Sequence, residues 1–183
     1  MKTITLFIGK SGAGKDYYLK KYLKENKNSK AIVSITTRPP RPNEKNGVDY
    51  HFVSEDTFWT YKLTGKLVEY REYQTEFGEW LYGTPNFINT IYDDYVGVVD
   101  INGAIDIIRY YYRCNDIIIY CYYVNTNDDI RTQRAIARGG FNKDEWNRRL
   151  IADNNDFSEE RLNKLDIELK AHNYPLIKVI DNN

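Results

Sequence analysis

The strongest constraint on how this chain folds lies near its start, where an apolar run ends at a glycine-rich loop. Residues 3–8 alternate around β-forming side chains and predict a buried strand. Apolar residues at helical spacing then predict a helix over residues 14–24. A glycine-rich loop between a strand and a helix lets backbone N–H groups converge on phosphate oxygens, and the helix N-terminus adds positive potential. We therefore predict a phosphate-binding loop over residues 9–15.

The loop sequence is consistent with ATP binding, with Lys15 as a catalytic residue that reaches the β- and γ-phosphates. The alternative is a glycine-rich turn with an incidental lysine, but the position directly after an apolar strand favours the phosphate loop. Asp16 stands where the pattern usually has a Ser or Thr that contacts Mg²⁺. The residues predicted to bind the ATP phosphates are Gly9, Ser11, Gly12, Ala13, Gly14, Lys15 and Asp16.

In the rest of the chain, strands alternate with helices, except in a middle segment of short strands around one helix. Strands are predicted at 31–35, 95–101, 117–124 and 176–180, and helices at 104–112, 128–138, 144–153 and 158–171. This alternation predicts a parallel sheet covered on both faces. Between them, short strands at 50–53, 67–73 and 80–82 and a helix at 55–63 predict a small mixed lobe. We expect a single α/β domain over 1–183, with a core of 1–36 and 87–183 and the lobe inserted at 37–86.

Composition narrows the class of partner. Lys+Arg and Asp+Glu both total 26, so the net charge gives no reason to expect nucleic acid or a membrane surface. No apolar run has the length of a membrane helix, and Met1 leads straight into the first strand without a signal peptide. Cys114 and Cys121 lack metal-ligand spacing and are expected as reduced thiols. We predict a cytoplasmic monomer or homodimer that acts on small molecules.

A second group of phosphate-binding residues follows the strand at 31–35. Arg38 and Arg41 lie on a loop stiffened by three prolines, shortly before Tyr50. Guanidinium groups bind phosphate in a forked geometry, and rigid prolines reduce the entropy lost when the arginines are ordered. From these residues alone, a basic surface loop or a proline-rich ligand for another domain remain open alternatives.

Taken with the phosphate loop, these residues resemble the guanylate kinase family. The resemblance runs through Ser34–Glu44 and Asn46–Val53, then through Leu67-Val68-Glu69-Tyr70, Tyr82-Gly83-Thr84, Val99-Asp100-Ile101-Asn102-Gly103 and the arginines of 131–149. It covers about residues 3–153. It implies a phosphate-loop kinase core with a GMP-binding lobe, a helical lid near 138–146, and transfer of phosphate from ATP with Mg²⁺ to GMP or dGMP.

The resemblance also implies roles for individual residues. Glu69 would accept hydrogen bonds from the N1–H and 2-amino groups of guanine, although composition alone favours a solvated strand residue. Asp100 would order magnesium-bound water or the base-side network, with a helix cap as the alternative. Asp16 and Asp100 are the candidate Mg²⁺ ligands. The residues implied to bind the acceptor phosphate are Ser34, Arg38, Arg41, Tyr50 and Tyr82, with Arg38 also catalytic. Those implied on the base side are Glu69, Thr84, Asp100 and Asn102.

Arginines between 131 and 149 are the candidate lid residues. Arg134 and Arg138 are four apart and share one helix face, and with Arg149 they match the family's catalytic lid arginines. A solvated basic helix face is the alternative. Arg131 and Arg148 match less clearly and are left out of the predicted site.

The chain also departs from the family pattern. Asn102 stands where a second acid is usual, residues 71–80 are about two longer, and the tail after 154 is expected to end in a strand rather than a helix. Two other functions therefore stay open: a catalytically silent, protein-binding guanylate kinase-like scaffold, and a kinase of the same fold with another nucleoside monophosphate as acceptor. The intact Lys15 and arginines favour the enzyme.

Overall fold

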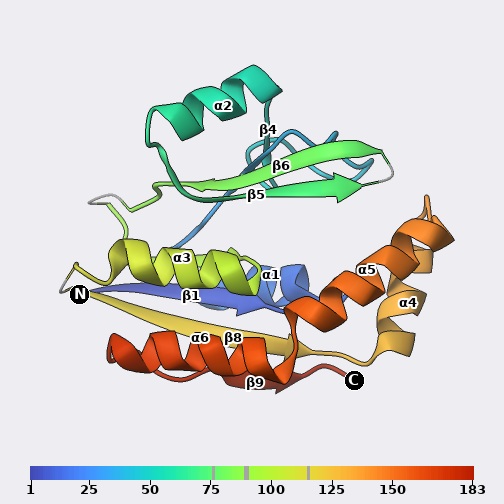
Figure 1. Ribbon diagram of the computed structural model, residues 1–183. Coiled ribbons are helices and arrows are strands. Elements are labelled where there is room, and N and C mark those ends of the chain that lie inside the picture. The colour runs from blue at the N-terminus through green and yellow to red at the C-terminus, as the bar shows by residue number, and fades with distance from the viewer. Residues whose placement is uncertain (76, 89–90, 115) are drawn as a thin grey trace. The chain divides into compact units, whose positions relative to one another are not determined.

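The computed structural model describes residues 1–75, 77–88, 91–114 and 116–183. The chain forms two compact units, one made of Met1–Ala31 with Tyr92–Asn183 and the other of Ile32–Ile91. The first contains a parallel sheet and the second a mixed sheet, which confirms the α/β class predicted from the sequence (Figure 1). Each unit is described by itself below.

The first unit is a five-stranded parallel sheet. β1 occupies its centre, so the loop that follows β1 opens at the carboxyl edge, where open α/β sheets bind ligands. The strands, in spatial order, are β2 (Ser29–Ala31), β7 (Asp94–Val98), β1 (Lys2–Ile8), β8 (Ile117–Asn125) and β9 (Lys178–Asp181).

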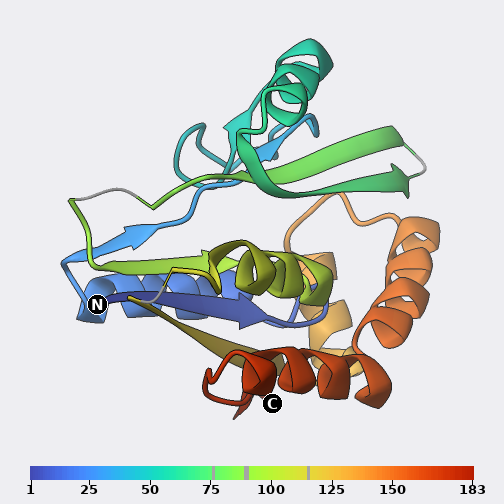
Figure 2. The same ribbon diagram turned by 60° about the vertical axis from the view of Figure 1, so that its left-hand side comes forward.

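Helices cover both faces of this sheet. α1 (Lys15–Glu25) packs its partly buried tyrosines and leucines on a core of Phe7, Ala13, Val96 and Val124. α3 (Ile101–Tyr111) and α6 (Glu159–Ala171) contact each other and lie in front of the sheet in Figure 1, with α1 behind it. Figure 2 shows the same layers from the side. The predicted coverage on both faces is therefore confirmed.

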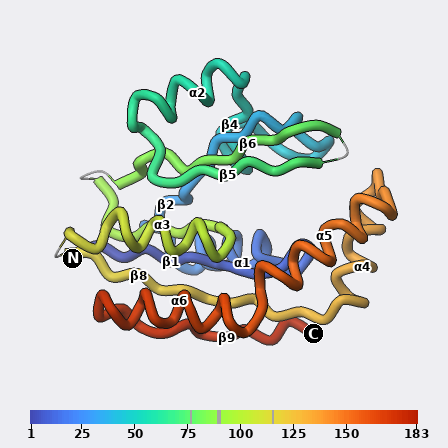
Figure 3. The backbone as a smooth tube through the Cα atoms, viewed as in Figure 1, coloured from blue at the N-terminus to red at the C-terminus, as the bar shows by residue number. Residues whose placement is uncertain are grey.

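Two further helices follow β8. α4 (Asp128–Ala137) and α5 (Lys143–Asp156) run back along each other, and Gly139 and Gly140, both with positive φ, lie between them. Figure 3 shows that the C-terminal end of the chain lies at the edge of the sheet where α4 begins, and Asn127 N–H donates to the Asn183 side chain across that junction at 2.8 Å.

The second unit is a four-stranded mixed sheet covered by one helix. Its strands, in spatial order, are β4 (His51–Phe52), β3 (Ile35–Thr36), β6 (Gly78–Pro85) and β5 (Leu67–Thr75). α2 (Glu55–Leu63) begins after Ser54, whose hydroxyl accepts the Thr57 N–H at 3.3 Å. Phe58 of α2 packs with Ile35 and Leu81 to form the core of this unit.

Two sequence predictions about strands were wrong. The single strand expected at 31–35 is divided, because β2 pairs with β7 in the first unit whereas β3 pairs with β6 in the second. The strand expected at 95–101 ends at Val98, because the Asp100 carboxylate accepts the Gly103 N–H at 2.6 Å and α3 begins at once. The chain does end in a strand, β9, as predicted.

The remaining general expectations concern membranes and thiols. Among the described residues, no helix combines the length and apolar character needed to cross a bilayer. Cys114 is an exposed free thiol, and burial raises the pKa of the free Cys121 thiol to about 12. The roles of residues 37–86 as a GMP-binding lobe and of 138–146 as a lid stay predictions.

Candidate functional site

The glycine-rich loop joins β1 to α1, and the backbone at its two ends requires glycine. Gly14 immediately precedes α1 and has φ +99°, a left-handed conformation that favours glycine. At Gly9, a Cβ atom would lie 2.7 Å from the Val124 carbonyl oxygen of the neighbouring strand. The close approach to β8 and the turn into the helix explain why the loop needs glycine at both ends.

Lys15 begins α1 and folds back over the loop. Its Nζ donates to the carbonyl oxygens of Gly9 at 2.7 Å and Lys10 at 3.0 Å. Burial lowers the pKa of Lys15, and the nearby carboxylates of Asp16 and Asp153 oppose that shift. In the described part of the chain no carboxylate forms an ion pair with Lys15, so a phosphate would not displace one on arrival.

The carbonyl oxygen of Ala13 connects the loop to distant segments. It accepts hydrogen bonds from Thr126 Oγ1 at 2.9 Å, Asn182 Nδ2 at 2.8 Å and an Arg134 guanidinium nitrogen at 3.1 Å. The loop is thereby tied to the end of β8, to α4 and to the residues after β9.

A pocket of about 330 Å³ opens beside the start of α1. It brings two predicted lid arginines, Arg134 and Arg138, together with Asp16, the predicted metal ligand of the loop. Asn182 was missed, although a polar residue directly after the last strand of a parallel sheet is a recognisable signal. The residues that line the pocket are Gly14, Asp16, Tyr17, Arg134, Arg138 and Asn182.

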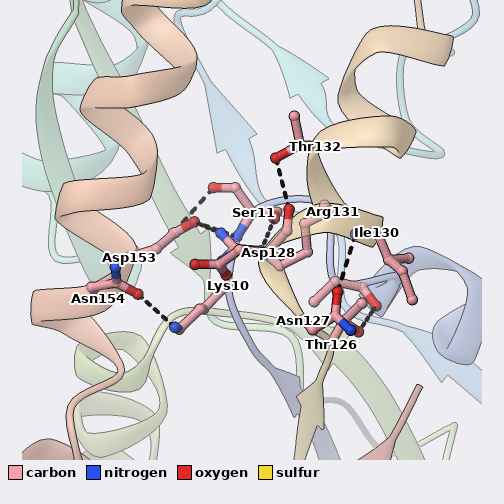
Figure 4. A network of polar contacts seen from close by, with 12 residues as sticks. Lys10, Ser11, Thr126, Asn127, Asp128, Ile130, Arg131, Thr132, Asp153 and Asn154 are labelled. Atoms are coloured by element: carbon pink, nitrogen blue, oxygen red, sulfur yellow. Dashed lines mark hydrogen bonds and ion pairs between the residues drawn. The ribbon is translucent and has the colours of Figure 1, made fainter. Parts of the chain in front are cut away.

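Ser11 is held by a buried ion pair that sequence analysis missed (Figure 4). The side chain of Arg131 is fully buried and forms an ion pair with Asp153 of α5. Arg131 Nε donates to the Ser11 carbonyl oxygen at 2.7 Å, and the Ser11 N–H donates to Asp153 at 2.9 Å. An arginine and an aspartate within polar helices carry no sequence signal for this arrangement.

The third predicted lid arginine, Arg149, lies on α5 and is paired within its own helix. Glu145 accepts from Arg149 Nε at 2.7 Å and from Arg148 Nε at 2.8 Å. The hydrogen bonds from Arg148 and then Arg149 lower the pKa of Glu145 to about 2, against the effect of burial. Arg149 is not among the residues that line the pocket beside α1.

The acidic residues of the first unit bear on the question of Mg²⁺. Asp16 is exposed on the wall of the pocket. Asp100 caps the N-terminus of α3, which was the alternative role considered for it from the sequence, and Asn102 lies in the first turn of that helix. Among the described residues no cluster of three or more His, Cys, Asp or Glu side chains could hold a metal by itself. Mg²⁺ in phosphoryl-transfer sites uses one or two carboxylates and completes its shell with phosphates and water, so Asp16 fits that ion.

In the second unit, Arg38 is oriented by side chains from three segments. It is only 3% exposed, and its guanidinium donates to Tyr82 Oη at 3.1 Å and to Glu44 at 2.9 Å. Its Cζ lies 5.5 Å from the centre of the Tyr50 ring. The structure thus gathers three of the residues predicted to bind the acceptor phosphate.

Arg41 is less constrained than Arg38. Its side chain is 49% exposed, and its guanidinium lies 3.5 Å from the same Glu44 carboxylate. Glu44 therefore lies between two guanidinium groups and spaces them, a role that sequence analysis did not assign. A phosphate dianion could replace Glu44 as the shared acceptor.

Glu69 and Thr84, which were predicted to contact the base, form a hydrogen-bonded row with Ser34, which was predicted to bind the acceptor phosphate. The Glu69 side chain is 8% exposed, and its carboxylate accepts from Thr84 Oγ1 at 2.5 Å. Thr84 Oγ1 also lies 3.1 Å from Ser34 Oγ. A largely buried carboxylate fixed in this way is not the solvated strand residue that composition alone favoured. Arg71, which was not predicted, brings a guanidinium nitrogen 3.8 Å from the other Glu69 oxygen.

Comparison with known proteins identifies the family to which the chain belongs. The family model described as guanylate kinase matches residues 1–160, which include all of the second unit and most of the first. The chain belongs to the guanylate kinase family. Guanylate kinases among its curated relatives include that of Thermotoga maritima, 36% identical over 121 residues, and that of Lactococcus lactis, 33% identical over 108 residues.

These relatives match over only part of their length. The segment aligned with the Thermotoga maritima guanylate kinase covers 63% of this chain and 56% of that protein. The segment aligned with the Lactococcus lactis guanylate kinase covers 57% of this chain and 51% of that protein. A solved structure of guanylate kinase from Anaplasma phagocytophilum superposes with a TM-score of 0.56 at 20% identity, over 100% of this chain and 77% of that one. That likeness supports the guanylate kinase fold.

Proposed function

We propose that the protein transfers the γ-phosphoryl group of ATP to GMP or dGMP. The observation that carries this proposal is the largely buried Glu69 carboxylate, which Thr84 and Ser34 orient within the second unit. A carboxylate accepts hydrogen bonds and cannot donate them, and guanine presents two adjacent donors, N1–H and the 2-amino group, on one edge. Adenine offers an acceptor at N1, so two acceptors would face each other there.

Arg38 and Arg41 would bind the acceptor phosphate. Arg38 already has its fork oriented by Tyr82 and Glu44, so little side-chain entropy remains to be lost when a phosphate replaces or joins the carboxylate. Tyr82 and Tyr50 would complete the phosphate site from β6 and from the start of β4. Proton removal from the acceptor is not required, because a phosphate dianion is itself the nucleophile.

The phosphate loop would bind ATP. Its backbone N–H groups and the N-terminus of α1 favour negative charge, and Lys15 would neutralise charge on the transferred group. Arg134 and Arg138, which line the same pocket, and Arg149 on α5 would stabilise the charge that spreads over the equatorial oxygens in the transition state. Mg²⁺, held by Asp16 and through water by Asp100, would neutralise the β- and γ-phosphate oxygens. No covalent intermediate is needed.

One coupled assay tests the proposal. We expect kcat/KM for GMP and dGMP to exceed that for AMP by roughly 10³-fold or more, because adenine places an acceptor, not two donors, against the Glu69 carboxylate. Glu69→Gln should reduce that preference, since the amide replaces one acceptor with a donor. Comparable values for AMP and GMP would contradict the base assignment.

The same assay separates the alternatives. ATP binding without transfer to any common nucleoside monophosphate would favour the protein-binding scaffold. Transfer to a different monophosphate would favour a kinase of the same fold with another acceptor. A cytoplasmic location and a monomeric or dimeric state stay predictions from the sequence.

A further inference from the structure

The inference concerns Ser11, whose polar groups are all bound by the two helices that follow β8. Its N–H and hydroxyl donate to the two oxygens of Asp153 at 2.9 and 3.2 Å, and its carbonyl oxygen accepts from Arg131 Nε at 2.7 Å. Arg131 belongs to α4 and Asp153 to α5. The middle of the phosphate loop is therefore fixed by side chains more than a hundred residues away (Figure 4).

The burial of the Arg131–Asp153 ion pair is not explained by its contribution to stability. Arg131 is completely buried and Asp153 is 9% exposed. Buried ion pairs contribute little net stability compared with well-packed apolar residues, because both charges lose their hydration. What such a pair does impose is a definite geometry between α4 and α5, since a shift would separate the Asp153 carboxylate from the buried guanidinium. Arg131 also pairs with Asp128 of its own helix, and that contact fixes the guanidinium on α4.

The same helices carry the residues that face the pocket. Arg131 is one turn from Arg134, whose guanidinium reaches the Ala13 carbonyl oxygen at 3.1 Å. On α5, Trp146 donates to Thr132 Oγ1 of α4 at 3.0 Å, and its ring lies 5.9 Å from the Arg131 guanidinium carbon. Loop, α4 and α5 thus share one packed polar junction.

We propose that Arg131 and Asp153 are positioning residues that set the phosphate loop in register with the arginines of α4. They act through Ser11 and contact no substrate. Their removal changes the distance between Lys15 and the pair Arg134 and Arg138, and so weakens the charge stabilisation of the transferring phosphoryl group. This assignment rests on the proposed phosphoryl transfer.

Two variants and a matched control test the pair. Asp153→Asn keeps the shape of the side chain but places an amide against the Arg131 guanidinium. The double variant Arg131→Met/Asp153→Leu replaces the ion pair with apolar side chains and should fold with a Tm at or above that of Asp153→Asn. Asp156→Asn makes the same change one turn later on α5, where the partner is the partly exposed Arg161.

We expect Asp153→Asn and the double variant to lower kcat by at least tenfold, with KM for GMP within twofold of wild type. Asp156→Asn should leave both constants unchanged. Amide hydrogen exchange at Ser11 in the nucleotide-free protein should accelerate in both variants of the pair. If the double variant does not fold, Asp153→Asn and the exchange measurement decide the question.

Three outcomes would overturn the assignment. The first is a double variant that regains wild-type kcat, because the pair would then be structural only. The second is equal behaviour of Asp153→Asn and Asp156→Asn. The third is tighter ATP binding in Asp153→Asn, which would identify the carboxylate as a competitor of phosphate. If wild type does not phosphorylate GMP, the proposed function fails, and affinity for ATP with Mg²⁺ together with Ser11 exchange still tests the pair.

Discussion

The two units hold their candidate phosphate-binding groups in different ways. In the first, the Lys15 ammonium is held by backbone carbonyl oxygens of the loop, and the loop itself by the carbonyl contacts of Ala13 and the buried pair at Ser11. In the second, the Arg38 guanidinium is held mainly by other side chains, Tyr82 and Glu44. Backbone geometry therefore dominates one site, and side-chain identity dominates the other.

This difference predicts how each site responds to substitution. An anion site built mainly from backbone groups should fail abruptly when its glycine geometry or the lysine of its loop is lost. A side-chain-built site should degrade in steps as each partner is replaced. The following predictions test that contrast, from the largest expected effect to the smallest.

Lys15→Met should cause the largest loss. The backbone cradle would remain, but the only loop side chain that folds over it as a cation would be gone, so kcat should fall by about 10³-fold or more. The matched control is Lys10→Met, because the Lys10 ammonium points to Asn154 at 2.6 Å and not over the loop. Steady-state kinetics of both variants measure the effect. Equal losses of kcat would show that a positive charge anywhere in the loop is sufficient and that the position of the Lys15 ammonium is not important.

Arg38→Lys should lower kcat/KM for GMP by about 100-fold while leaving ATP affinity unchanged. A lysine keeps the charge but loses the fork that now contacts Tyr82 and Glu44 together. Arg41→Lys, at a position that is 49% exposed, should cost about tenfold. Kinetics with GMP and calorimetric titration with ATP measure the two effects. A parallel loss of ATP affinity would show that the two units do not bind their ligands separately.

Gly9→Ala tests the backbone side of the comparison through stability. The added Cβ would lie 2.7 Å from the Val124 carbonyl oxygen, so β8 or the loop must move, at a cost of about 2–4 kcal/mol in free energy of unfolding. Gly65→Ala is the control, since its φ is +65° with no atom within 4 Å of the new Cβ, and it should cost about 1 kcal/mol. Urea denaturation of both variants gives the difference, which should exceed 1 kcal/mol.

These contrasts also indicate what a sequence can and cannot reveal. The bounds of α2 were predicted to the residue, because Ser54 and the acidic first turn mark its start and Gly65 follows its end. The phosphate loop was predictable for the same reason, since its geometry is encoded in local glycines. The division between β2 and β3 was not, because a run of β-forming residues does not specify which strand each half pairs with.

The residues that were missed share a physical cause. Arg131 and Asp153 lie on helices whose sequence is polar on most sides, and burial of a charged residue depends on a partner far along the chain. Asn182 likewise acquires its role from Ala13, and Glu44 from its two arginines. Long-range pairing of polar side chains leaves no periodic pattern to detect.

Glu145→Gln should have a smaller and pH-dependent effect. Because the folded pKa of Glu145 is about 2, below its ordinary 4.5, the stabilisation is fully present above pH 4.5 and is lost as pH falls toward 2. We expect a loss of about 1–2 kcal/mol at pH 7, reduced by solvent screening of Arg148, and almost none near pH 2. Denaturation at both pH values measures it, with the exposed Glu25→Gln as a control. A pH-independent difference would contradict the ion-pair explanation.

Asp16→Ser should have the smallest effect on turnover and a distinct effect on metal dependence. The exposed Asp16 carboxylate lies beside the pocket, where without a cation it repels the phosphates of ATP. We expect the variant to stay active within a few-fold, to bind metal-free ATP more tightly, and to gain less affinity when Mg²⁺ is added. Titration of ATP with and without Mg²⁺ on both proteins measures this. Identical metal dependence would exclude the coordination role.

The Ala13 carbonyl oxygen has a consequence for how the protein is made. Its donors come from residues 113, 121 and 169 positions later in the chain. The glycine-rich segment therefore cannot reach its final shape until Asn182, 169 residues further along, has been translated. Contacts of such long sequence separation form slowly and late. A nascent or truncated chain that lacks Asn182 would carry every residue of the motif and still have an incompletely anchored loop.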